Sequence, residues 1–217
     1  AQGVMMCVLC PVASSVTVVA SMLGANAIRT TTYTVIGNLM VAIVAPVYIS
    51  IFRSVQNNYG IGSSFLLILG KIASVIALPF FVVLLIQYFS PGLNSKIAKY
   101  KQLSFYLWAF ALLVTIGHTA DSVVTHWNGN YNNLLWLGAA SLLICAMQFG
   151  TGRLIGKRYG DRIAGGQLLA QKNSAMGIWM LNTFMNPVAS VALACYSIWQ
   201  NIFNSWQIYR MFAKKNQ

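Results

Sequence analysis

Long runs of apolar residues, separated by short polar segments, fill almost the whole chain. A bilayer core about 30 Å thick needs about 20 apolar residues for each helical span. By that measure the pattern predicts an all-α membrane protein, built as a multi-span helical bundle. The predicted spans cover residues 1–24, 29–52, 65–89, 103–127, 134–155 and 163–184, and a last one runs from Asn186-Pro187 to Met211.

Two of these spans carry polar residues near their centres. Cys10-Pro11 is followed by small and hydroxyl residues in the first span, and Gln171-Lys172-Asn173-Ser174 interrupts the sixth. Pro11 has no amide hydrogen and clashes with the preceding turn, and each unpaired polar group in hydrocarbon costs several kcal/mol. We therefore predict discontinuous helices at residues 1–24 and 163–184. A pair of interrupted spans is typical of a secondary-transporter binding site.

The two predicted broken helices lie about 160 residues apart and cross the membrane in opposite directions. Each is followed by a long unbroken span, which is the arrangement of an inverted repeat. Elsewhere, Ser90-Pro91-Gly92 predicts a turn that ends the third span, and we expect the lysines after it to lie in a loop.

The composition agrees with a membrane protein. Of the 217 residues, 58% are hydrophobic and 7% are charged, whereas soluble domains carry roughly a quarter charged residues. The net charge of +12 would suggest nucleic acid in a soluble chain, but here the basic residues lie between spans, so we exclude that partner and expect the lipid bilayer instead.

The basic residues also predict the orientation. Of the 14 lysines and arginines, all but Arg53, Lys71 and Lys172 fall on one side of the membrane when the loops alternate. By the positive-inside rule this side is cytoplasmic. We therefore expect a multi-pass protein of the plasma (inner) membrane, with a cytoplasmic C-terminus and with residues 128–130 outside.

The residues give no support for a metal site or for catalysis. Cys7-x-x-Cys10 lacks a second pair of ligands, and Cys145 and Cys195 also fall in apolar runs, where cysteine acts as a small hydrophobe. A nucleophile with a matching base is not evident. We expect neither an enzyme nor a resident metal.

The two interruptions resemble those of the bile acid:sodium symporter family. The likeness rests on Cys10-Pro11 with the small residues after it and on Gln171-Lys172-Asn173-Ser174. Leu78-Pro79, Ser90-Pro91 and Asn186-Pro187 are similar as well. The likeness covers nearly the whole chain, aligned to the C-terminal part of a ten-helix transporter, so that the first three helices would be missing.

This resemblance implies a core domain around two crossing discontinuous helices and a flatter panel domain. The core would comprise residues 1–52 and 132–212, and the panel residues 65–127. It also implies transport of small organic anions, with bile acids, pantothenate-like acids and keto acids all open. Helix N-termini at the breaks would offer amide donors to the anion. The candidate substrate-binding residues are Pro11, Ser14, Ser15, Asn173 and Ser174.

The sodium sites of that family are altered in this sequence. Leu168 stands where the family has a glutamate, and Lys172 where it has a glutamine. Sodium needs several oxygen ligands and some negative charge, so sodium coupling is doubtful and proton coupling or none stays open. Lys172 could snorkel to an interface, or it could act as a tethered cation on carbonyls near Pro11 and on hydroxyls of Thr17, Thr30 or Thr34. The residues assigned to this degraded sodium site are Lys172, Gln171, Thr17, Thr30 and Thr34.

A second charged group is predicted in the panel. Lys71 and Asp121 lie at equal depth in neighbouring antiparallel spans, and pairing would offset the cost of burying each charge. His118 lies one turn from Asp121, so a proton relay and a plain hydrogen bond to a neighbouring helix are both open.

Two functions from different classes follow. The first is a secondary transporter of small organic anions, which the retained polar breaks favour. The alternative is a non-transporting membrane sensor or partner subunit that kept the fold, which the lost carboxylate favours. The pattern does not indicate an oligomeric state.

Overall fold

The computed structural model describes residues 1–57, 61–100 and 131–215, together with scattered residues between 103 and 124. Within this part of the chain the regular structure is helical, which confirms the predicted all-α class. The helices in order are α1 (Gln2–Leu9), α2 (Val16–Met22), α3 (Ala27–Asn57), α4 (Ile61–Phe89), α5 (Pro91–Lys99), α7 (Tyr131–Arg158), α8 (Arg162–Ala170), α9 (Ser174–Phe184), the 3₁₀ helix η1 (Pro187–Ala189) and α10 (Ser190–Lys215).

The chain divides into two compact units. One comprises Ala1–Val41 and Thr115–Gln217, and the other comprises Ala42–Val114, so α3 carries the chain from one unit into the other. The assignment of these parts to a core and a panel domain stays a prediction. Most of the predicted span 103–127 lies outside the described residues, as do residues 128–130.

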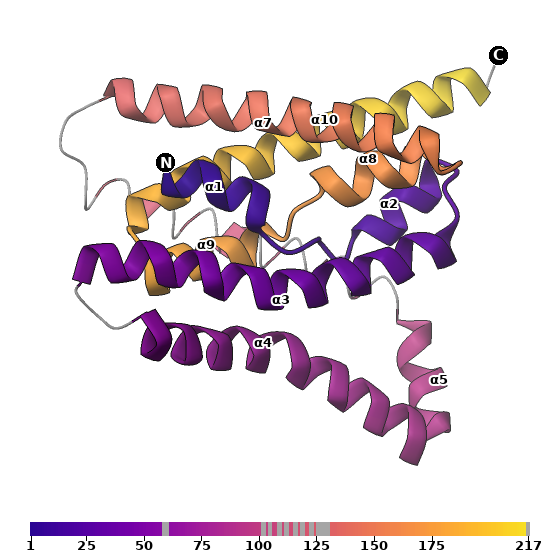
Figure 1. Ribbon diagram of the computed structural model, residues 1–217. Coiled ribbons are helices and arrows are strands. Elements are labelled where there is room, and N and C mark those ends of the chain that lie inside the picture. Colours follow the sequence, from indigo (N-terminus) through magenta and orange to yellow (C-terminus); the bar gives the residue numbers. More distant parts are fainter. Residues whose placement is uncertain are drawn as a thin grey trace. The chain divides into compact units, whose positions relative to one another are not determined.

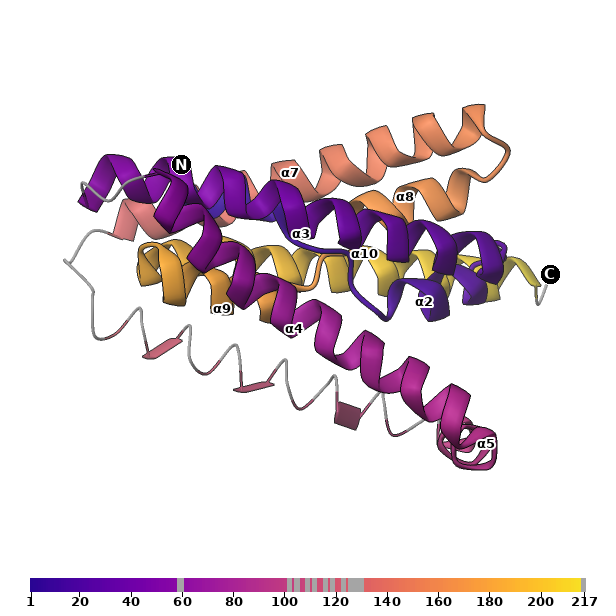
Figure 2. The same ribbon diagram turned by 60° about the horizontal axis from the view of Figure 1, so that its bottom comes forward.

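The first unit contains both predicted discontinuous helices. The first helix is divided into α1 and α2, and the second into α8 and α9. The long helices α7 and α10 pack on each other, α7 also packs on α1 and α8, and α10 packs on α1 and α9, as the two views show (Figure 1, Figure 2). The structure therefore places the extended breaks inside a helical bundle.

Glycines let α7 and α8 approach closely. A Cβ atom built on Gly165 of α8 would lie 2.7 Å from the Gly156 Cα atom of α7 and even closer to the Gly152 carbonyl oxygen. Such small-residue contacts are common where helices pack in membranes. The turn between the two helices ends at Gly160, whose φ of 82° is a left-handed conformation that glycine adopts readily.

The second unit contains the remainder of α3, together with α4 and α5. The predicted turn at Ser90-Pro91-Gly92 does end α4 at Phe89. The prediction that a lysine-bearing loop follows this turn is wrong. Residues Pro91–Lys99 form α5, with the proline in its first turn. Proline is favoured there because the first helical N–H has no partner in the helix.

Two described helices are long and apolar enough to cross a membrane without a break, Ala27–Phe52 and Asn132–Arg158. The halves of the broken helices are each too short to do so. Long apolar side chains on α7 are largely exposed, including Leu135, Trp136 and Leu154 at 71%, 74% and 72%. Exposed apolar faces of this extent suit a lipid environment.

Candidate functional site

The break in the first discontinuous helix follows directly from Pro11. A proline disfavours helical geometry at the residue before it, and Cys10 accordingly has an extended backbone, with φ −58° and ψ 142°. Pro11, Val12 and Ala13 are buried, and α2 begins only at Val16. Buried extended residues in a helical bundle need hydrogen-bond partners from elsewhere in the protein.

The second break lies between α8 and α9. Gln171 is extended, with φ −82° and ψ 102°, and Asn173 is the N-cap of α9. The Asn173 side chain accepts a hydrogen bond of 3.2 Å from the Met176 N–H, as asparagine N-caps commonly do. The polar run at 171–174 thus ends one helix and starts the next.

The two breaks pair with each other. Val12 and Lys172 form an antiparallel bridge, flanked by a hydrogen bond of 3.0 Å from Ala13 N to Gln171 O and one of 2.7 Å from Asn173 N to Pro11 O. In this pattern Val12 and Lys172 are a non-hydrogen-bonded pair, so their own N–H and C=O groups point outward. We call this two-segment contact the crossing.

A side-chain amide occupies each outer edge of the crossing. Asn38 of α3 accepts from Val12 N at 2.7 Å and donates to Val12 O at 3.2 Å. Gln200 of α10 accepts from Lys172 N at 2.9 Å and donates to Lys172 O at 3.2 Å. The outward backbone groups of both central residues are therefore satisfied.

The ammonium group of Lys172 lies at the carboxyl end of α1. Its Nζ atom donates to the Val8 carbonyl at 2.8 Å, and the lysine as a whole is only 6% exposed. The neighbouring Cys7 carbonyl accepts from Gln148 Nε2 at 3.0 Å. These carbonyls belong to the last turn of α1 and have no partner within that helix, so side chains from elsewhere satisfy them.

Other predicted site residues are bonded elsewhere. Thr30 Oγ1 donates to the Asn26 carbonyl and Thr34 Oγ1 to the Thr30 carbonyl, both at 2.8 Å, while the Thr17 hydroxyl lies 3.3 Å from that of Thr31. Among the described residues, Lys172 therefore contacts a carbonyl near Pro11 but none of these hydroxyls. Its role as a tethered cation stays a prediction.

The remaining candidates surround the crossing. Gln171 donates to the Gln167 side chain in the preceding turn of α8. Ser174 is buried at the start of α9, whereas Ser14 is exposed and Ser15 half-buried. Binding of substrate by these residues stays a prediction.

The predicted panel group of Lys71, Asp121 and His118 is distributed over the chain as follows. Lys71 lies in α4 of the second unit and Asp121 in the first unit, and His118 lies outside the described residues. The Lys71–Asp121 pair stays a prediction.

The sequence interpretation missed several residues that build the site. The sequence pattern does not predict Asn38, Gln148 or Gln200 as site residues, nor Tyr196, whose hydroxyl donates to the Ala170 carbonyl at 2.6 Å at the end of α8. Asn38 and Gln148 each lie within an otherwise apolar stretch, which by itself marks a functional or structural role.

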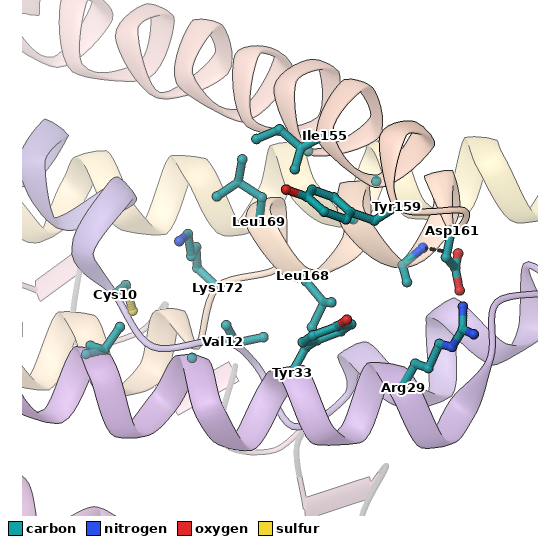
Figure 3. Close-up of a pocket in the computed structure, with 16 residues that line it drawn as sticks. Cys10, Val12, Arg29, Tyr33, Ile155, Tyr159, Asp161, Leu168, Leu169 and Lys172 are labelled. Atoms are coloured by element: carbon teal, nitrogen blue, oxygen red, sulfur yellow. Dashed lines mark hydrogen bonds between the residues drawn. The ribbon is translucent and has the colours of Figure 1, made fainter.

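A cavity of about 570 Å³ opens beside the crossing. Figure 3 shows Arg29 and Asp161 at one end of it and Cys10 and Lys172 at the other. Tyr33 lines it from α3, and apolar side chains of α3, α7 and α8 line much of the remainder. The cavity therefore combines apolar walls with charged groups at both ends.

Asp161 also organises the end of the cavity away from the crossing. It is the N-cap of α8 and accepts from Ala164 N at 2.8 Å, and its other oxygen accepts from Asn26 N at 3.3 Å, just before α3. The carboxylate thus links the start of α8 to the start of α3.

The sequence of this chain was compared with known proteins and with models of protein families. No curated protein matches the chain. A model of the SBF-like CPA transporter family matches residues 1–208, and this family is similar to the bile acid:sodium symporters, so the predicted family is confirmed. Because the match spans far more than half of the sequence, the chain belongs to the SBF-like CPA transporter family, whose members are membrane proteins that transport solutes.

Proposed function

We propose that this protein carries small organic anions across the membrane without sodium, with the Lys172 ammonium in place of a bound cation. The observation that carries the proposal is the hydrogen bond from Lys172 Nζ to the Val8 carbonyl at the crossing. Membership of a transporter family supports transport as the activity. The pairing of two broken helices, each followed by a long helix, supports an inverted repeat.

The charge at the crossing supports a cation there. Both α1 and α8 end at the crossing, and the carboxyl end of a helix carries a partial negative charge of roughly half an elementary charge. A lysine ammonium is a compact point charge with three donors. The ammonium compensates the partial negative charge that a sodium ion would otherwise compensate, and it repels a second cation.

A carboxylate to hold sodium is also missing from the position where the resembling family has one. Leu168 occupies that position and lines the cavity. Asp161 lies at the opposite end of α8, and a helix of that length, with a rise of about 1.5 Å per residue, puts it about 13 Å away. The carboxylate is thus too distant to help ligate an ion at the crossing.

The cavity supports an organic anion as the transported molecule. An amphipathic carboxylate would place its apolar body along Leu168 and Ile155 and its charge toward a basic side chain, Arg29 or Lys172. The residues predicted from the breaks, Asn173 and Ser174, lie next to Lys172 along the chain and complete the proposed site.

Uptake into proteoliposomes tests the proposal. A radiolabelled bile acid, pantothenate and pyruvate would be offered in sodium and in choline buffers. We expect at least one of them to accumulate at the same rate in both buffers. Uptake that requires sodium would refute the absence of sodium coupling.

A sensor or partner subunit is the second candidate. It is favoured by the completeness of hydrogen bonding at the crossing, where side-chain amides already occupy the backbone groups of Val12 and Lys172. Saturable binding of an anion without uptake would favour it over transport.

A further inference from the structure

The two edges of the crossing are covered in the same way. Asn38 follows Val12 by 26 residues, and Gln200 follows Lys172 by 28. Each amide comes from the long helix after its own broken helix, α3 or α10. The two halves of the chain thus share one arrangement. In each half a broken helix is followed by a long helix, and a side-chain amide of the long helix bonds to the central residue of the break.

Asparagine and glutamine suit this task for a chemical reason. Their planar amides provide an acceptor and a donor together, which matches the N–H and C=O groups that one extended residue presents at an edge. An unpaired edge would otherwise expose both groups. The side chains of Asn38 and Gln200 therefore bond the two outer edges of the crossing in the way that neighbouring strands would.

We propose that Asn38 and Gln200 are a matched pair of positioning residues that fix the register of the crossing without a bound ion. A slip of one residue would turn every side chain of an extended segment to the opposite face. Fixing Lys172 from its backbone therefore fixes where its ammonium points. The register of the crossing is set by the protein's own residues, whatever molecule is transported.

Cys10 offers a probe of the crossing. Its thiol donates to the Asn173 carbonyl at 2.8 Å, and its side chain is fully buried although it lines the cavity. A crossing that opens would free this thiol toward the cavity. Cys145, which is also fully buried, lies in α7, outside both break segments, and serves as the reference thiol for general loosening.

The experiment is labelling with N-ethylmaleimide in detergent, read at each cysteine by mass spectrometry. The test variants are Asn38→Leu and Gln200→Met, which remove both bonds at one edge. The matched controls are Thr32→Val and Asn201→Leu, since within the part of the chain that the structure describes the Thr32 hydroxyl and the Asn201 amide bond to carbonyls of their own helices.

We expect each test variant to speed labelling of Cys10 about tenfold or more, since local opening follows from the loss of buried hydrogen bonds, while Cys145 and both controls stay at the wild-type rate. The proposal is overturned if Cys10 in both test variants stays at the rate of the controls. It is also overturned if Cys145 speeds up as much as Cys10, because that would mean general loosening rather than opening of the crossing. The Gln200→Glu variant keeps an acceptor for the Lys172 N–H, so its Cys10 should be labelled more slowly than Cys10 of the Gln200→Met variant. The reverse order would contradict the role of Gln200 as a positioning residue.

Discussion

Replacing Gly165 by alanine should destabilise the protein, although alanine is the better helix former. The new Cβ atom would lie 2.7 Å from Gly156 Cα and 2.9 Å from Gly156 N on α7. Carbon atoms in ordinary contact lie about 3.5–4.0 Å apart, so α7 and α8 would have to separate by about 1 Å. The obstructing atoms belong to backbone and cannot move aside as a side chain would.

The magnitude follows from comparison with a matched glycine. Overpacking of this kind costs about 1–3 kcal/mol, whereas Gly150→Ala on α7 would meet no atom within 4 Å and should gain about 0.5–1 kcal/mol from helix propensity. For a chain of this size each kcal/mol shifts Tm by about 2–4 °C. We expect Gly165→Ala to melt several degrees below the wild type, and Gly150→Ala at or slightly above it.

The assay is thermal unfolding in detergent, followed by tryptophan fluorescence. Because Gly165 lines the cavity, binding of an organic anion should weaken in the same variant. Equal melting temperatures for the two alanine variants would refute the close approach of α7 and α8.

Two further predictions concern the site and the topology. Tyr196→Phe removes the donor to the Ala170 carbonyl and should cost about 1 kcal/mol, which lowers Tm by a few degrees; an unchanged Tm would contradict that bond. From the charge asymmetry, a cysteine at Asn130 should react in whole cells with an impermeant thiol reagent, and one at Lys214 should not, in a background without the native cysteines; the opposite labelling would reverse the orientation.

The breaks could be predicted because their causes are local. Pro11 lacks an N–H whatever its surroundings, and a run such as Gln171-Lys172-Asn173 is too polar for an unbroken apolar helix. The structure accordingly interrupts both helices at these residues.

The partners of the breaks could not be predicted, because they depend on packing between distant segments. An amide in an apolar stretch, such as Asn38 or Gln148, indicates a role but not which backbone it will contact. The sequence does not mark Gly165 either, because its role in letting α8 approach α7 depends on the partner helix. In Ser90-Pro91-Gly92 the same proline that ends α4 also starts α5.

The central claim is that Lys172 supplies the positive charge at the crossing. Its most direct test is equilibrium binding of an anion identified by the uptake panel, with sodium exchanged for choline, in the wild type and in Lys172→Gln. We expect the wild-type Kd to stay the same in both buffers, and the Kd of Lys172→Gln to rise about tenfold, since the carboxyl end of α1 loses its compensating charge. A wild-type protein that loses binding in choline, or a Lys172→Gln variant that binds as the wild type does, would contradict the claim.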